Sequence, residues 1–256
     1  MDTALTITSR ANPRFKTLRA LVAPGGAKRT HTLLLGEKLI EAWVEAANTP
    51  VGQRFRPLTW LRLEGVPAHP LEKLRAPETL VLGETLMRDL ASAGSPPAHA
   101  LLMELGPEPT GALPARVIVP WGIQDPGNLG AILRSAASFG FQEALLGPGC
   151  ADPFSPKALR GTMGAAFLLA VRQWDKLIPD PGSWYALHGE KGALRLEQAD
   201  LQEPVRILVG NEGHGWKDAE LPPVVKFLAI PILGMESLNA AVAAGIACYE
   251  VARRAR

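Results

Sequence analysis

The sequence is poor in cysteine: only Cys150 and Cys248 occur among 256 residues. They lie far apart, and neither has a partner at metal-ligand spacing, which argues against a disulfide framework and predicts no metal site. The first residues contain no apolar stretch typical of a signal peptide. No uncharged apolar run reaches the ~18 residues that a membrane-spanning helix requires. We therefore expect a cytoplasmic protein with no membrane contact.

Phosphate-binding glycine loops are also missing. The chain has 25 glycines, but none form the G-x-G-x-x-G fingerprint of a dinucleotide site or a Walker loop. This argues against a dinucleotide or nucleoside-triphosphate enzyme. The net charge of +2 is too small to identify a nucleic-acid partner by itself.

Positive charge is nevertheless unevenly distributed. Within the first 40 residues, only Asp2 and Glu37 oppose a cluster of cations. These cations are Arg10, Arg14, Lys16, Arg19, Lys28, Arg29 and Lys38. Such a cluster suits contact with phosphate groups, but a solvated basic face would look the same. Charge alone leaves both interpretations open.

The pattern of apolar residues predicts two regions. Residues 106–114 are rich in proline and glycine and read as a linker. After it, short apolar runs at 116–120, 143–146, 184–188, 205–209 and 226–230 alternate with several helical patterns. Strands that alternate with helices predict a mostly parallel sheet covered on both faces. Residues 1–105 show a mixed pattern of helices and strands.

Three further segments carry the chemistry. They are residues 125–134 (DPGNLGAILR), 208–215 (LVGNEGHG) and 230–239 (IPILGMESLN). In this order and spacing they resemble the motifs of the SpoU (TrmH) family of RNA ribose 2′-O-methyltransferases, in the SPOUT superfamily. Residues 7–18 similarly resemble the opening of a substrate-binding domain found in part of that family. Residues 95–100 (SPPAHA) depart from that domain, where a Pro-Gln-Gly-Ile-like turn is expected.

The resemblance implies an α/β fold. A C-terminal SPOUT-like methyltransferase domain with an α/β trefoil knot would span residues 115–256. A smaller N-terminal α/β substrate-binding domain would span 1–105 and hold RNA, with Arg10, Arg14 and Lys16 as candidate contacts. The resemblance also implies S-adenosylmethionine as the cofactor and a homodimer with its active site near the interface.

The first motif has a bland interpretation and a functional one. Asn128 could simply cap the helix that follows it, and Arg134 could be a surface cation. The resemblance instead assigns both residues to catalysis. A charged guanidinium has no acceptor lone pair, so it is a poor base. We therefore expect Arg134 to orient the ribose or a phosphate and to stabilise developing negative charge.

The other two motifs would form the cofactor pocket and the rest of the catalytic site. The resemblance assigns Gly210, Ile230 and Leu238 to the cofactor. It assigns Glu212, Ser237 and Asn239 to catalysis, together with Asn128 and Arg134. On pattern alone, Glu212 could stabilise its own loop, and Ser237 is a good candidate to cap the last helix.

The terminal helical pattern from residue 240 to 249 is apolar nearly all round, which predicts burial in a core or in a dimer interface. The predicted function is methyl transfer from S-adenosylmethionine to a ribose 2′-hydroxyl. The Asn12-Pro13 opening resembles the version attached mainly to rRNA-modifying relatives, so we favour rRNA over tRNA. A non-catalytic RNA-binding relative and an unrelated nucleotide-dependent α/β enzyme are the alternatives.

Overall fold

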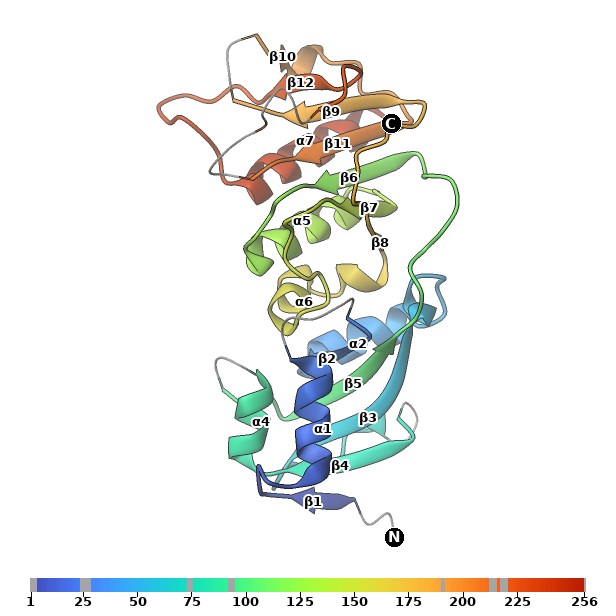
Figure 1. Ribbon diagram of the computed structural model, residues 1–256, viewed down its shortest axis with the longest axis vertical. Coiled ribbons are helices and arrows are strands. Elements are labelled where there is room, and N and C mark those ends of the chain that lie inside the picture. Colours follow the sequence, from blue (N-terminus) through green and yellow to red (C-terminus); the bar gives the residue numbers. More distant parts are fainter. Residues whose placement is uncertain are drawn as a thin grey trace. The chain divides into compact units, whose positions relative to one another are not determined.

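The computed structural model describes residues 4–23, 29–72, 76–91, 95–189, 192–211, 216 and 221–255. The chain divides into two compact units (Figure 1). The first contains Met1–Pro107 and Phe154–Phe167, and the second contains Glu108–Pro153 and Leu168–Arg256.

The first unit is built on a five-stranded mixed sheet of order β1-β4-β3-β5-β2. Strands β1, β4 and β3 are parallel, whereas β5 runs antiparallel to both β3 and β2. The strands are β1 (Leu5–Ile7), β2 (His31–Leu35), β3 (Phe55–Leu63), β4 (Glu78–Leu82) and β5 (His99–Leu105). The helices of this unit are α1 (Pro13–Val22), α2 (Glu37–Ala46), α4 (Glu84–Ala91) and α6 (Pro156–Thr162).

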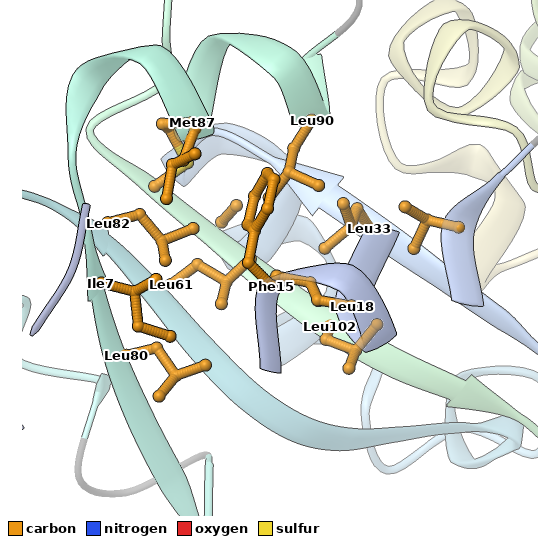
Figure 2. Close-up of a cluster of buried hydrophobic side chains, with 13 residues drawn as sticks. Ile7, Phe15, Leu18, Leu33, Leu61, Leu80, Leu82, Met87, Leu90 and Leu102 are labelled. Atoms are coloured by element: carbon orange, nitrogen blue, oxygen red, sulfur yellow. The ribbon is translucent and has the colours of Figure 1, made fainter. Parts of the chain in front are cut away.

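Helices α1 and α4 pack on one face of this sheet (Figure 2). Phe15 and Leu18 of α1 meet Leu61 and Leu82 of the sheet, and all four are at most 4% exposed. Pro13 stands at the first helical position, and Asn12 caps the helix by accepting from the backbone N–H of Arg14 at 2.9 Å. Successive residues of a strand face opposite sides of the sheet, so Leu34, which is as buried as Leu33, packs on the other face.

A segment far along the chain packs with this unit. Phe154 and Phe167 both make edge-on contacts with Phe55 of β3, with ring centroids 5.7 and 4.9 Å apart. The hydroxyl of Thr32 donates to the carbonyl of Phe154 at 2.6 Å. Our predicted division placed residues 154–167 in the C-terminal domain. The structure groups them with the first unit, because their aromatic rings are buried against its strands.

The second unit contains a seven-stranded sheet of order β10-β12-β9-β11-β6-β7-β8, and every neighbouring pair is parallel. Its strands are β6 (Arg116–Pro120), β7 (Glu143–Leu146), β8 (Ala170–Gln173), β9 (Ser183–Leu187), β10 (Leu194–Arg195), β11 (Val205–Val209) and β12 (Lys226–Ala229). The two long helices are α5 (Pro126–Ser138) and α7 (Ala240–Arg254), which pack on each other. The prediction of a parallel α/β sheet is confirmed.

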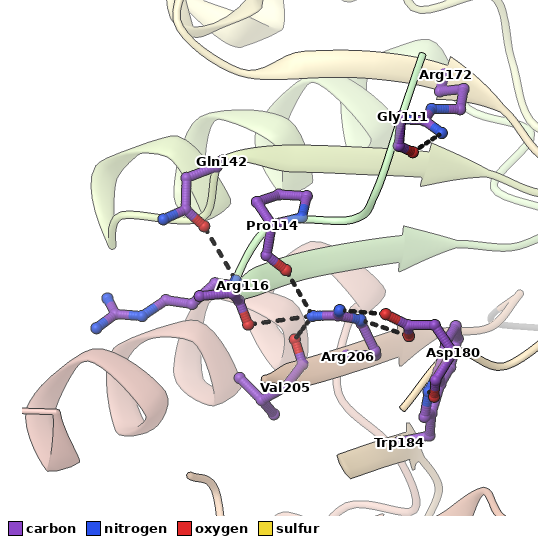
Figure 3. Close-up of polar contacts among 10 residues, drawn as sticks. Gly111, Pro114, Arg116, Gln142, Arg172, Asp180, Trp184, Val205 and Arg206 are labelled. Atoms are coloured by element: carbon purple, nitrogen blue, oxygen red, sulfur yellow. Dashed lines mark hydrogen bonds and ion pairs between the residues drawn. The ribbon is translucent and has the colours of Figure 1, made fainter. Parts of the chain in front are cut away.

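Two arginine side chains of the second unit hold part of the segment that we predicted to be a linker, residues 106–114 (Figure 3). Arg206 of β11 is 1% exposed and forms an ion pair with Asp180, with N–O distances of 3.0 and 2.6 Å. The same guanidinium donates to the carbonyl of Pro114 at 2.8 Å, and Arg172 donates to that of Gly111 at 3.2 Å. A buried cation needs such partners to offset its lost hydration. Residues 111–114 are therefore held on the second unit.

Helix α7 is buried on one side only. Ala240, Ala244, Ala247, Cys248 and Val251 face the protein interior. Val242, Ile246 and Tyr249 are 51, 37 and 53% exposed. One apolar face of the helix thus remains in solvent in the single chain, so its own core does not bury it completely, and burial in a dimer interface stays a prediction.

No helix in the described part of the chain is long and apolar enough to cross a membrane.

Candidate active site

A cavity of about 430 Å³ opens where three parallel strands of the second unit end. Ligands of open parallel sheets bind at the carboxyl ends of strands, where the following loops diverge. The lining comes from the ends of β9, β11 and β12 and from the start of α7: Leu187, His188, Gly189, Val209, Gly210, Asn211, Trp216, Leu228, Ile230, Ile232, Glu236, Ser237, Leu238, Ala240 and Ala243. Gly210, Ile230 and Leu238, our three predicted cofactor residues, thus lie around one cavity, and Ser237 joins them.

Two predicted catalytic residues meet beside this cavity. The side-chain amide of Asn239 donates from Nδ2 to Oδ1 of Asn128 at 3.2 Å. Asn239 lies between Leu238 and Ala240 in the chain, and both of these line the cavity. The contact therefore couples the segment that forms the pocket wall to the beginning of α5.

The two helix caps differ from those that the residue pattern alone suggests. Asp125, not Asn128, caps α5: its Oδ1 accepts from the backbone N–H of Asn128 at 2.9 Å. Asn239, not Ser237, caps α7, where its Oδ1 accepts from the N–H groups of Ala241 and Val242 at 2.9 and 3.3 Å. Our prediction that Ser237 caps α7 is wrong. Because Asn128 does not cap α5, its side chain contacts Asn239. Ser237 does not cap α7, and it lines the cavity.

Arg134 lies on α5, and its side chain is exposed. Six residues separate it from Asn128, which places the two about 120° apart around the helix. Within the described part of the chain, Arg134 makes no hydrogen bond or ion pair with Asn128 or Asn239. The structure therefore leaves its guanidinium directed to solvent, where a substrate can reach it.

Glu212, the remaining predicted catalytic residue, lies outside the described residues. Next to it, Asn211 donates from Nδ2 to the carbonyl of Gly122 at 3.1 Å. The backbone N–H of Trp121 donates to the carbonyl of Val209 at 2.9 Å. These bonds tie the end of β11 to the segment that leads into α5, so two of the motifs support each other.

The predicted RNA contacts lie in the first unit, and all three are exposed. Arg10 forms a two-pronged ion pair with Asp89, with N–O distances of 2.6 and 2.7 Å. Arg14 pairs with Glu78 at 2.7 Å. Lys16 has no ion pair with any described residue. Of the three cations, Lys16 is therefore the one whose charge no carboxylate offsets.

Among the lining residues that the sequence did not predict, four have polar or aromatic side chains: His188, Asn211, Trp216 and Glu236. Asn211 and Glu236 lie inside the recognised motifs, so their positions could have indicated a role. Trp216 directly follows the second motif. His188 follows an ordinary buried strand, and no sequence signal marks it.

Gly210 shows why a glycine is needed at the end of β11. A Cβ atom placed on it would lie 2.9 Å from Cε2 and Nε1 of the Trp216 indole, closer than real Cβ contacts allow. The resemblance to the SpoU family assigns this glycine to the cofactor pocket. In the structure, its missing side chain makes room for the indole ring.

Burial disfavours the thiolate form of both cysteines. Burial raises the pKa of the Cys150 thiol, which donates to the carbonyl of Pro120 at 3.3 Å. Burial also raises the pKa of the fully buried Cys248 thiol. A thiol is reactive as the thiolate, so the raised pKa values lower the reactivity of both side chains near neutral pH.

Comparison with known proteins agrees with this geometry. Residues 115–249 match the SpoU rRNA Methylase family. An uncharacterised tRNA/rRNA methyltransferase of Synechocystis sp. is 33% identical over 97% of this chain and 93% of its own length. The 23S rRNA (guanosine(2553)-2′-O)-methyltransferase RlmP of Bacillus subtilis is 30% identical over 96% of this chain and 98% of its own.

The fold is also shared with a solved structure. The crystal structure of an AdoMet-bound rRNA methyltransferase from Sinorhizobium meliloti superposes with a TM-score of 0.78, covering 98% of both chains at 22% identity. This likeness shows the fold, and the sequence matches show the family. The chain belongs to the SpoU rRNA methylase family and has the α/β SPOUT fold, as its three motifs predicted.

Proposed function

We propose that this protein transfers a methyl group from S-adenosylmethionine to a ribose 2′-hydroxyl in rRNA. The observation that carries the proposal is the position of Asn239. Its neighbours in the chain line the cavity, while its side chain contacts Asn128 of the first motif over 3.2 Å. Residues 238–240 would therefore contact both a methyl donor in the cavity and a ribose hydroxyl held by the two asparagines.

The cavity fits the cofactor in size and chemistry. Its volume of about 430 Å³ falls in the range of ~300–1,000 Å³ typical of small-molecule sites. Aliphatic side chains such as Leu228 and Ile230 suit the flat adenine ring. Glu236 and Ser237 supply polar groups for the ribose and the amino-acid portion. Glu236 is also the one acidic side chain among the described lining residues, which favours a positively charged ligand.

The cofactor, when bound, supplies an electrophilic methyl group. The chain's own residues would do the rest. Asn128 and Asn239 present amide groups that can hold the ribose hydroxyl or an adjacent phosphate in line. Arg134, exposed on α5, would pair with phosphate and stabilise the negative charge that develops on the hydroxyl oxygen. Its planar fork suits this task better than a point charge.

The names of the family and of one relative favour rRNA as the substrate. The family is that of the SpoU rRNA methylases, and the Bacillus subtilis relative is named as a 23S rRNA methyltransferase. A tRNA substrate is the second candidate, because the Synechocystis relative is named for both RNAs. The first unit would hold the RNA, with Lys16 contacting phosphate directly. Arg10 and Arg14 would exchange their carboxylate partners for phosphate.

A homodimer is part of the same proposal. A shallow hollow lies between α5 and α7, with Asn128 and Asn239 at one end. Its other lining residues are mostly small or apolar: Ala131, Ser135, Phe139, Ala241, Val242, Gly245, Ile246 and Tyr249. A second copy that covers this face would bury the exposed Val242, Ile246 and Tyr249 and would place the asparagine pair near the interface. The trefoil knot and the cytoplasmic location also remain proposals, supported by the motifs and the composition.

The deciding experiment is to map ribose methylation across total RNA from cells with and without the gene. One missing 2′-O-methyl group in rRNA is the expected result. A missing group in tRNA would select the second candidate. No change at any ribose, combined with intact RNA binding, would support a non-catalytic relative instead.

A further inference from the structure

Trp216 joins the core of the second unit to the wall of the cavity. Its side chain is 7% exposed and packs with buried residues of the sheet, including Val119 and Leu208. Its ring centroid lies 6.3 Å from that of Trp121, with the planes tilted by 46°. The same residue lines the cavity. The indole is thus held firmly by the core while one part of it borders the ligand space.

The nitrogen edge of this indole lies against Gly210. The nearest heavy atoms to a Cβ placed on Gly210 are Cε2, Nε1 and Cδ1 of Trp216, at 2.9, 2.9 and 3.4 Å. Gly210 is itself a lining residue. The five-membered ring of Trp216, with its N–H group, therefore lies against the glycine that forms the wall.

This N–H group has no acceptor. Nε1 of Trp216 is buried and makes no hydrogen bond within the described chain. A buried donor without a partner costs free energy, and Trp normally finds an acceptor for its N–H when buried. Trp43 and Trp174 also have buried indole nitrogens without an acceptor, but neither lines the cavity. Trp216 is the case in which a ligand could supply the missing acceptor.

We propose that Trp216 is a cofactor-binding residue whose Nε1–H donates a hydrogen bond to an acceptor atom of bound S-adenosylmethionine. The inference rests on the proposed function, because it requires that the cofactor enters this cavity. It gives Gly210 a second purpose: the glycine allows the indole to reach the wall. Because the core fixes the ring, the donor is oriented before the ligand arrives, which lowers the entropic cost of binding.

The test compares Trp216→Phe with Trp174→Phe. Both variants keep an aromatic ring and remove one unpartnered indole N–H, but only the first changes the cavity wall. Affinity for S-adenosylhomocysteine is measured by titration calorimetry. Loss of one hydrogen bond should weaken binding by about three- to tenfold in Trp216→Phe. Affinity should stay unchanged in Trp174→Phe.

A second measurement follows binding in the unaltered protein. In the unaltered protein labelled with ¹⁵N-tryptophan, the indole N–H resonance of Trp216 should move downfield when S-adenosylhomocysteine is added. Its assignment comes from its absence in Trp216→Phe or Trp216→Tyr. Titration with methylthioadenosine, which lacks the amino-acid portion, then locates the acceptor. A shift with both ligands places it on the adenosine, and a shift with S-adenosylhomocysteine alone places it on the amino acid.

The outcomes separate this inference from the proposed function. If the unaltered protein binds S-adenosylhomocysteine but Trp216→Phe binds equally well and the indole resonance stays in place, the inference about Trp216 is wrong and the function stands. If the unaltered protein does not bind the ligand at all, the proposed function fails, and this inference fails with it.

Discussion

Asn239 performs two tasks with one side chain. Its Oδ1 accepts from the backbone N–H groups of Ala241 and Val242, and its Nδ2 donates to Oδ1 of Asn128 at 3.2 Å. The cap orients the amide, because the oxygen that faces α7 leaves the nitrogen to face α5. Two residues far apart in the chain are thereby placed in contact at the beginnings of two helices.

The first prediction separates these tasks. Asn239→Asp keeps acceptor oxygens for the cap, and a negative charge is favourable at a helix N-terminus, so stability should change by less than about 0.5 kcal/mol. The variant loses the amide donor and places a charge next to the developing oxyanion, so methyl transfer should fall at least about a hundredfold. Asn239→Ala should lose the cap as well, at a cost of about 1 kcal/mol. Denaturant unfolding and single-turnover transfer measure the two effects. Full transfer by the Asp variant would show that Asn239 only caps the helix.

The second prediction concerns Arg134. Arg134→Ala should abolish turnover while sparing cofactor affinity, because the side chain is exposed on α5 and does not line the cavity. Arg134→Lys should also be slow, since an ammonium group lacks the planar fork. The assay is single-turnover transfer from labelled cofactor followed by alkaline hydrolysis, which cannot cut a 2′-O-methylated linkage. Methylated bases without hydrolysis-resistant dinucleotides would refute methylation of the ribose.

The third prediction tests the contact between Gly210 and Trp216. Gly210→Ala should destabilise the protein by about 1–3 kcal/mol, because the new Cβ overlaps the indole ring. In a Trp216→Leu background the same change should cost much less. Gly210→Val should in addition weaken cofactor binding, as expected for a wall residue. A double-mutant cycle by denaturant unfolding gives the coupling. Additive effects would mean that the indole does not constrain this position.

The fourth prediction concerns assembly. The apolar face of α7 is half exposed, so sedimentation at micromolar concentration should give a mass near twice 27.4 kDa. Ile246→Arg places a charge in the hollow between α5 and α7 and should yield monomers with little activity. Val224→Arg is the control, because Val224 is 48% exposed but does not line that hollow. A fully active monomer would contradict the dimer.

The fifth prediction concerns RNA binding by the first unit. Affinity should fall as salt rises, because phosphate contacts release counterions. Lys16→Ala should weaken binding to all RNAs alike and reduce the slope of log affinity against log salt by about one. Arg10→Ala should have a smaller effect, since its charge is already paired with Asp89. Unchanged affinity and slope in Lys16→Ala would place the RNA surface elsewhere.

Much of the second unit was predictable from sequence, because its signals are local. Buried parallel strands appear as short apolar runs, and all five predicted runs correspond to strands of its sheet. Each of the three motifs lies at or shortly after the end of one of these strands, and their order predicted the family. The clustering of Gly210, Ile230 and Leu238 follows from the same rule, since loops after parallel strands meet at one edge of the sheet.

Other features were decided only by tertiary structure. Ser237 and Asn239 are both good cap residues, and the choice depends on where α7 begins, which is at Ala240, directly after Asn239. The placement of residues 154–167 depends on aromatic contacts with Phe55, about a hundred residues earlier in the chain. The exposed face of α7 is set by which side packs on α5. Whether the buried indole N–H of Trp216 finds an acceptor depends on all the groups that surround it. Each of these features depends on contacts between distant segments, which the composition or periodicity of a single segment does not predict.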